Sequence, residues 1–237
     1  MISAFFASIS GIISSYRRHA VTADNVANAG TRAYKTRRLL PREGRTGGVD
    51  STQVCRDDSQ GPLLWTENPL DLAVQGEGFL QVELDDGTVA YRRGGTLILD
   101  RGGSLSTAEG QPIVPSFRIP SGTTRLTITA LGEIRAAAGG ENRLLGRIEM
   151  ARFRNPSGLI QVGSGLFLET PSSGPPLIAS PGSGGMGILV QGAVEGSNVD
   201  LATEYVMDIL SSVEHKANLD SLRTQDQMLG TLLDIKT

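Results

Sequence analysis

The 237-residue sequence is poor in the side chains that most often carry catalysis and metal binding. Its single cysteine, Cys55, excludes an internal disulfide and a cysteine-rich zinc site. Its two histidines, His19 and His215, lie near opposite ends of the chain, which leaves little material for a histidine metal site or a catalytic triad. No apolar run reaches the roughly 18 residues of a membrane span. We therefore expect no membrane insertion, no metal and no cofactor.

The formal net charge of −3 hides a gradient along the chain. Residues 1–45 carry eight Lys or Arg against two Asp or Glu, whereas residues 195–237 carry three against eight. The two ends are therefore of opposite sign, which favours their pairing wherever they meet. The small total argues against a general nucleic-acid binder.

A basic segment follows the first helical pattern. Its cations are Arg32, Lys35, Arg37, Arg38, Arg42 and Arg45. Binding to nucleic acid would call for interleaved aromatic side chains, and only Tyr34 is near. We interpret the segment as a solvated or subunit-facing surface and expect no nucleic-acid partner.

Common catalytic motifs are absent from the sequence. It contains no His-Glu-x-x-His, no Gly-x-x-x-x-Gly-Lys and no Gly-x-Ser-x-Gly, and Gly76-Glu77-Gly78 leads into a strand rather than a helix. Cys55 has no histidine base in its part of the chain. A pair of carboxylates could serve glycoside hydrolysis, but acidic residues at turns are usually solvated. The four carboxylates close in sequence are Asp71, Glu77, Asp85 and Asp86.

Residues 2–29 follow a helical period. With Ile2 at position a of a heptad, the apolar and aromatic side chains fall on positions a, d and e, and no proline interrupts them. His19 falls on a d position and is expected at a helix interface, and Gly30 is a plausible C-terminal cap. The principal members of this stripe are Ile2, Phe5, Phe6, Ile9, Ile12, Ile13, Tyr16 and Val26.

The other end of the chain has a similar pattern. A helix capped by Ser197 or Asn198 is predicted, with its stripe interrupted by the polar run 223–227. The stripe contains Val199, Val206, Ile209, Leu210, Val213 and Ala217, and resumes with Met228, Leu229 and Leu232. Two such stripes cannot be buried alone, so the helices must pair with each other or with helices of other copies.

The middle of the chain reads as short strands and tight turns. Residues 79–84 alternate and run into Asp85-Asp86-Gly87, a hairpin signal, with the return strand over 88–92. Further strands are predicted over 97–99, 126–129, 144–153 and 166–168, whereas 43–61 and 172–187 read as loops.

The predicted fold class is mainly β with long terminal α-helices. An antiparallel β domain accompanies a paired N- and C-terminal coiled-coil segment. The expected division has an N-terminal helix over 1–30, a basic connector and loop over 31–67, the β domain over 68–187, and a connector with the C-terminal helix over 188–237.

Several stretches resemble one protein family. The run from Asp24-Asn25-Val26-Ala27-Asn28 to Thr31, followed by Tyr34-Lys35, is similar to the N-terminal signature Asn-Asn-x-Ala-Asn-x-x-Thr-x-Gly-(Phe/Tyr)-(Lys/Arg) of bacterial flagellar rod and hook proteins. Residues 68–79, 99–110 and 191–200 resemble later motifs of the same family, in the same order. The sequence departs from the pattern at Ala33, where the family usually has glycine, so the turn there is expected to differ.

This resemblance implies a structural role rather than an enzymatic one. Rod proteins are exported unfolded through the flagellar type III apparatus without a cleaved signal peptide, and they polymerise into the axial driveshaft across the periplasm. The implied partners are copies of the chain, other axial proteins and the export apparatus. The assembly interface would comprise both stripes together with Asn25 and Asn28. The alternative is a secreted β-domain carbohydrate-binding or hydrolytic protein that oligomerises through its ends.

Overall fold

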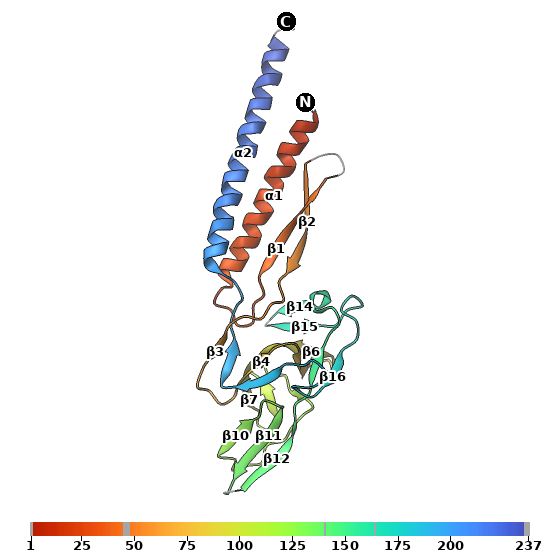
Figure 1. The fold of residues 1–237 in the computed structure, drawn as a ribbon, viewed down its shortest axis with the longest axis vertical. Coiled ribbons are helices and arrows are strands. Elements are labelled where there is room, and N and C mark those ends of the chain that lie inside the picture. Colours follow the sequence, from red (N-terminus) through yellow and green to blue (C-terminus); the bar gives the residue numbers. More distant parts are fainter. Residues whose placement is uncertain (1, 45–47, 140, 164, 235–237) are drawn as a thin grey trace. The chain divides into compact units, whose positions relative to one another are not determined.

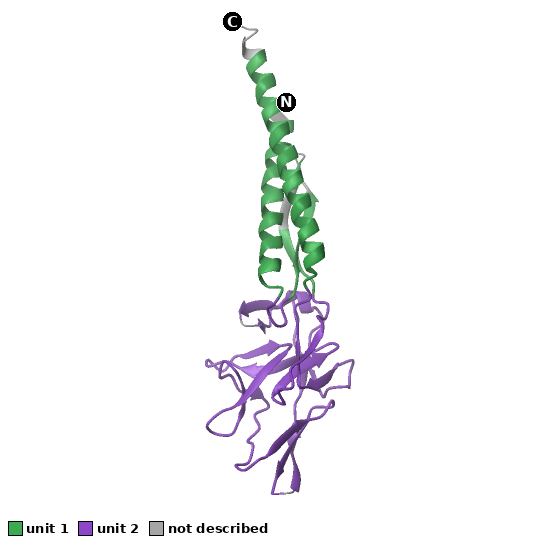
Figure 2. Cartoon of the chain, turned by 90° about the vertical axis from the view of Figure 1, so that its left-hand side faces the viewer, with its two compact units in different colours: residues 1–29, 35–57, 199–237 green, residues 30–34, 58–198 purple. Residues whose placement is uncertain are grey.

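The structure is a computed structural model that describes residues 2–44, 48–139, 141–163 and 165–234. The chain divides into two compact units, coloured separately in Figure 2. Unit 1 comprises residues 1–29, 35–57 and 199–237, and unit 2 comprises residues 30–34 and 58–198. The chain is mainly antiparallel β with one long helix at each end, which confirms the predicted fold class.

Unit 1 is built around two helices, α1 (Ile2–Ala27) and α2 (Leu201–Asp234). They lie side by side and run in opposite directions (Figure 1). At a rise of about 1.5 Å per residue they measure roughly 39 and 51 Å. Because neither contains proline and both repeat apolar residues every three or four positions, each forms one uninterrupted helix.

The N-terminus of α2 is capped by Asp200, not by Ser197 or Asn198 as predicted. One carboxylate oxygen of Asp200 accepts from the Ala202 N–H at 3.1 Å, and the other accepts from the Thr203 hydroxyl at 2.6 Å. The side-chain amide of Asn198 instead donates to the Ser59 carbonyl at 3.0 Å. The hydrogen bond from Thr203, aided by the Ala202 N–H, lowers the pKa of Asp200.

Unit 1 also contains an antiparallel hairpin, β1 (Arg37–Glu43) and β2 (Val49–Arg56). The prediction of a loop over 43–61 is wrong for residues 49–56, because they form β2. Pro41, which has no N–H, lies where the register shifts between Leu40 and Arg42. The hairpin packs on α1, and the Val49 N–H donates to the Ser10 hydroxyl at 3.1 Å.

Unit 2 contains all the remaining strands and one short 3₁₀ turn, η1 (Pro156–Gly158). The strands are β3 (Leu63–Trp65), β4 (Asp71–Gln75), β5 (Phe79–Glu83), β6 (Val89–Arg92), β7 (Gly94–Leu99), β8 (Leu105–Thr107), β9 (Ile113–Val114), β10 (Arg125–Ile128), β11 (Glu133–Ala138), β12 (Glu141–Arg147), β13 (Met150–Arg152), β14 (Ile160–Gly163), β15 (Leu166–Leu168), β16 (Leu177–Ala179), β17 (Ile188–Gln191) and β18 (Ala193–Glu195).

The strands of unit 2 form four antiparallel sheets. The largest has the order β14-β15-β6-β5-β13-β16, with β9 also paired to β5. A second has the order β17-β4-β7-β8, a third is β10-β11-β12, and β18 pairs with β3. The predicted hairpin of β5 and β6 is confirmed, with Gly87 at a φ of 80° in its turn.

Two of the expectations for the middle of the chain need correction. The stretch 172–187, predicted as a loop, contains β16, which pairs with β13. The single strand predicted over 144–153 is two strands, β12 and β13, in different sheets. β16 is only three residues long and is flanked by Ser, Gly and Pro, so the composition of the stretch predicted a loop.

Unit 2 has a continuous apolar core between its sheets. Its most buried members include Leu72, Val74, Leu80, Val82, Leu97, Ile134, Ile148 and Met150. A second cluster packs aromatic rings edge to face, with Tyr91 and Phe153 at 4.7 Å between centroids. The core also holds a buried ion pair, in which Arg93 Nε lies 2.9 Å from a carboxylate oxygen of Glu195.

Candidate assembly surface

The faces through which α1 and α2 meet are polar, and we call them the polar seam. Its residues are spaced alternately three and four apart on each helix, the spacing of a coiled-coil core. They are buried or half-buried. On α1 they are Ser8, Gly11, Ser15, Arg18, Thr22 and Asn25, and on α2 they are Glu204, Asp208, Ser211, His215, Asn218, Leu222 and Gln225.

Charge pairs and hydrogen bonds cross the seam along its length. Arg18 lies 2.6 Å from Glu214, and His19 Nδ1 lies 2.5 Å from an Asp208 carboxylate oxygen. The Ser15 hydroxyl lies 3.1 Å from His215 Nδ1. The basic N-terminal and acidic C-terminal segments therefore pair, and His19 lies at the helix interface as predicted.

Gly11 allows the helices to approach closely at the middle of the seam. A Cβ atom at this position would lie 2.6 Å from the Asn218 side-chain oxygen. The glycine that weakens the isolated helix is therefore the residue that lets α2 fit against it.

Asn25, from the motif that resembles flagellar rod proteins, joins three elements of unit 1. Its side-chain amide donates to the Arg37 carbonyl at 2.8 Å and to Glu204 at 3.1 Å, and its side-chain oxygen accepts from the Arg37 N–H at 2.9 Å. Only 1% of the residue is exposed. Asn28 instead donates to the Asp24 carbonyl at 2.9 Å, at the end of α1. Both asparagines therefore have roles inside unit 1.

The apolar stripe of α1 lies on the side of the helix away from the seam. At about 100° per residue, its members are centred roughly opposite Ser15 and Arg18. Phe5, Phe6, Ile13 and Tyr16 are exposed, Tyr16 by 68%. Ile9, Ile12 and Val26 are half-buried. The side chain of Ile2 lies outside the described residues.

The apolar stripe of α2 is exposed in the same way. Val213 is exposed by 61%, and the other exposed members are Val206, Ile209, Leu210, Ala217, Met228 and Leu229. Val199 precedes the helix and is half-buried. The side chain of Leu232 lies outside the described residues. Both helices thus present apolar faces that their mutual packing does not cover, and we refer to the two stripes together as the apolar faces.

Apolar periodicity alone does not predict the polar seam. A second periodicity was present, with small and polar residues at heptad spacing on the opposite side of each stripe. Ser, Asn, Gln and oppositely charged residues at that spacing indicate a helix–helix contact. A search for apolar residues alone does not detect such a contact.

Some cations of the basic segment are buried or make contacts within the units, and others are exposed. Lys35 is buried, Arg37 lies 3.2 Å from Asp24, and Arg32 donates to the Thr96 hydroxyl at 2.8 Å. Arg38 and Arg42 are exposed, and Arg45 lies outside the described residues.

The carboxylates considered for glycoside hydrolysis have separate surroundings. Asp71 is buried and accepts from the Asn68 amide at 3.0 Å, while Glu77 is paired with Arg152 at 3.4 Å. Asp85 and Asp86 are exposed at the turn between β5 and β6. Two cavities of unit 2 near Ile119 are lined by other residues.

The residues that the structure describes lack two other features, a metal-binding cluster and a membrane-spanning helix. Within them, no group of three or more His, Cys, Asp or Glu side chains is placed to hold a metal ion. No helix in this part of the chain has the length and apolar character needed to cross a bilayer. Cys55 is a half-buried free thiol on β2.

Comparison with known proteins places these features in context. Residues 73–136 match the model of the flagellar hook protein FlgE/F/G D1 domain. The flagellar basal-body rod protein FlgG of Buchnera aphidicola subsp. Acyrthosiphon pisum is 35% identical over 98% of this chain and 99% of its own length. FlgG of Bacillus subtilis is 30% identical over the full length of both chains. The flagellar hook protein FlgE of Escherichia coli is 40% identical over 40% of this chain and 24% of its own length.

Proposed function

We propose, from the premise that this chain belongs to the family of flagellar basal-body rod and hook proteins, that its helices build the rod by packing their apolar faces against other copies. Membership makes the chain a structural subunit located at the flagellar basal body and assembled with other axial proteins. Beyond this membership, we propose which surfaces the copies use to assemble and how the assembly carries load. The alternative of a secreted carbohydrate-binding or hydrolytic protein is not favoured, because the full-length relatives are rod proteins.

The exposed apolar faces of unit 1 carry the proposal. Each large apolar side chain removed from water contributes about 1.5–3 kcal/mol. Since Phe6, Tyr16, Ile209 and Val213 remain exposed after α1 and α2 have packed, a large part of this free energy is left for contacts between copies. An exposed apolar area of this kind marks an interaction surface.

The polar seam explains why these faces are available. Because polar groups and charge pairs hold α1 to α2, pairing within the chain uses little of the apolar surface. Each copy then presents two different apolar faces, one on α1 and one on α2. If the α1 face of one copy packs on the α2 face of the next, the contact is heterologous, and it generates a helical filament when the rotation between copies does not close a ring.

Torque would pass through these packed contacts without bond chemistry, so we propose that the chain is not an enzyme. We also propose that it spans the periplasm within the rod and is exported by the flagellar type III apparatus without a cleaved signal peptide, as its resemblance to axial proteins implies. Neighbouring rod and hook subunits are the proposed partners.

A charge placed on an apolar face tests the proposal. Val213→Asp should prevent assembly, because a carboxylate cannot be buried there without a partner. The measurement is sedimentation of the purified chain, together with swimming of cells that carry the variant. Ser212→Asp, one position earlier on an exposed flank of α2, is the matched control and should assemble. Assembly and swimming by Val213→Asp would overturn the proposal, provided that a thermal melt shows both variants folded.

A further inference from the structure

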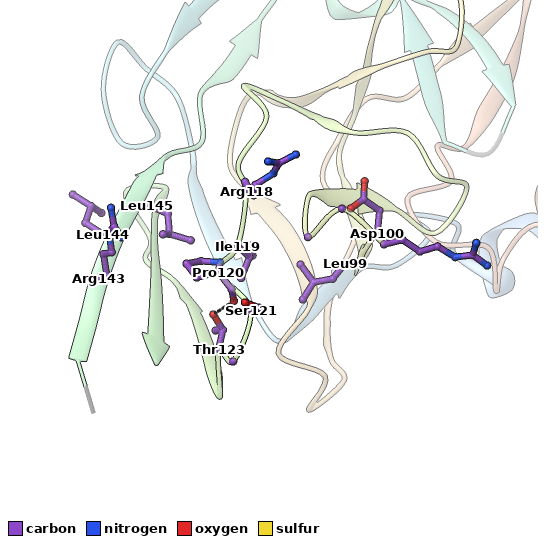
Figure 3. Close-up of a pocket in the computed structure, with 14 residues that line it drawn as sticks. Leu99, Asp100, Arg118, Ile119, Pro120, Ser121, Thr123, Arg143, Leu144 and Leu145 are labelled. Atoms are coloured by element: carbon purple, nitrogen blue, oxygen red, sulfur yellow. Dashed lines mark hydrogen bonds between the residues drawn. The ribbon is translucent and has the colours of Figure 1, made fainter. Parts of the chain in front are cut away.

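Unit 2 has an open cleft that the helix-based assembly does not use. It has a volume of about 940 Å³ and lies between the β7–β8 turn, residues 118–123 and β12. Figure 3 shows Arg143 and Leu145 on the β12 side and Arg118, Ile119 and Leu99 on the other segments. Ile119 is buried and forms apolar lining together with Leu99 and Leu145, so the cleft has both apolar and cationic residues in its lining.

Three arginines at this cleft have no acidic partner among the described residues. They are Arg101, Arg118 and Arg143. Five other arginines of unit 2 are paired with carboxylates, namely Arg92, Arg93, Arg135, Arg147 and Arg152. The described residues offer no such carboxylate to Arg125 or Arg154, which lie outside this cleft. The cleft contains Asp100, but one of its carboxylate oxygens accepts the Ser104 N–H at 2.7 Å and holds the turn. The cleft is therefore a cationic site with capacity for carboxylates.

Unit 2 also has an acidic projection, the turn between β5 and β6, whose charge is opposite to that of the cleft arginines. Glu83, Asp85 and Asp86 are exposed at the β5–β6 turn, and none of them has an ion-pair partner in the described part of the chain. The Thr88 N–H donates to Asp86 at 2.9 Å and lowers the pKa of that carboxyl, which keeps it ionised. The Gly87 N–H closes the turn on the Leu84 carbonyl at 2.9 Å, so the projection is a narrow hairpin end.

We propose that the arginine cleft of one copy receives the acidic β5–β6 turn of a second copy. The turn does not line the cleft of its own chain, so the two surfaces can meet only between copies. The inference rests on the proposed function in so far as copies assemble, but it assigns unit 2 a contact of its own. Two different surfaces of one unit meet in a heterologous contact, the kind from which an open assembly can grow.

A cross-link between copies tests the contact directly. In a Cys55→Ser chain, one preparation carries Asp85→Cys and another carries Ser121→Cys, which lies at the cleft. A short thiol-reactive cross-linker should join the two preparations into a mixed dimer. Ser172→Cys, an exposed position outside the cleft, replaces Ser121→Cys in the control and should give no such dimer. Absence of the mixed dimer with Ser121→Cys would overturn the proposal.

The same cross-link in the Val213→Asp background separates this proposal from the helix-based one. A mixed dimer that persists when helix-mediated assembly is lost supports the cleft contact by itself. Normal assembly of Val213→Asp with cross-linking at the cleft would contradict the helix proposal alone. Loss of the cross-link in folded Val213→Asp at high protein concentration would contradict the independent cleft contact.

Charge reversal gives a second, quantitative readout. Arg118→Glu with Arg143→Glu should raise the concentration needed for assembly on the order of tenfold, because close charge pairs at interfaces carry large coupling energies. Asp85→Arg with Asp86→Arg should do the same, and combining all four changes in one chain should restore assembly. Weakening by the cleft reversal alone, without rescue by the turn reversal, would show that a different acidic partner occupies the cleft and would overturn the proposal.

Discussion

At the scale of single residues, Ala33 stands out by its backbone. Its φ of 54° lies in the left-handed region, which costs a residue with a Cβ atom about 1–2 kcal/mol. Its N–H donates to the Glu195 carbonyl at 2.9 Å, so the conformation is fixed by a partner in unit 2. The motif that this chain resembles usually has glycine here, a residue that adopts positive φ without steric cost, and the altered turn expected from sequence stays a prediction.

Ala33→Gly should therefore stabilise unit 2 by about 1 kcal/mol, because glycine adopts positive φ without a steric cost. Thermal or urea unfolding of the full chain measures the change. Ala108→Gly is the matched control, since Ala108 is an exposed turn residue without positive φ, and it should not stabilise. Equal effects of the two substitutions would show that the strain at Ala33 is not released by glycine.

The buried pair of Arg93 and Glu195 is a second feature at this scale. Glu195 is 1% exposed at its side chain and also accepts the Gly61 N–H at 3.1 Å, while Arg93 donates to the Gly78 carbonyl at 2.7 Å. Arg93→Met alone should cost about 3–5 kcal/mol, because it removes the Arg93 guanidinium from its ion pair with a buried carboxylate.

The double variant Arg93→Met with Glu195→Gln should cost less than the two single changes added together, since no uncompensated charge is then buried. Urea unfolding of the four chains gives the coupling free energy. Strict additivity would mean that the two side chains do not stabilise each other.

At the scale of elements, the start of α2 depends on one carboxylate. Since its hydrogen bonds lower the pKa of Asp200 in the folded chain, the stability they supply is present above the ordinary aspartate pKa. It is lost as the pH falls through the lowered folded value. Asp200→Ala should fray the first turn of α2 at neutral pH and remove this acid sensitivity.

Asp200→Asn keeps an N-cap acceptor that does not titrate, so it should hold the first turn at neutral pH and show no acid loss there. Amide hydrogen exchange at Ala202 and Thr203 measures both variants. Protection in Asp200→Ala equal to that of the parent chain would show that the side chain does not cap the helix.

The elements also show what sequence patterns can predict. The helices were predictable because their apolar residues repeat over many turns, and β5 with β6 because Asp85-Asp86-Gly87 separates two alternating runs. The hairpin of β1 and β2 was not, since its arginines and Pro41 resemble a loop and its pairing depends on packing against α1. The predicted cap residue was wrong because Ser197, Asn198 and Asp200 are all good capping residues. Only the tertiary context selects Asp200 among them.

At the scale of the whole molecule, the resemblance of the motifs predicted the family, and the full-length relatives bear it out. The sequence also predicted that the helices pair, but not through which faces. Apolar stripes were evident in Ile9, Tyr16 and Val213, whereas the seam formed by Ser15 and His215 consists of small and polar residues that a search for apolar periodicity does not find. The membership of Asn25 and Asn28 in an assembly interface, expected from the resemblance, stays a prediction.

We propose above all that assembly buries the apolar faces and leaves the polar seam within each copy. Thiol labelling of Val213→Cys in a Cys55→Ser chain, before and after assembly, tests it most directly. Labelling should be fast in the unassembled chain, where Val213 is 61% exposed, and much slower in the assembled rod. Labelling that stays equally fast in the assembled rod would contradict it.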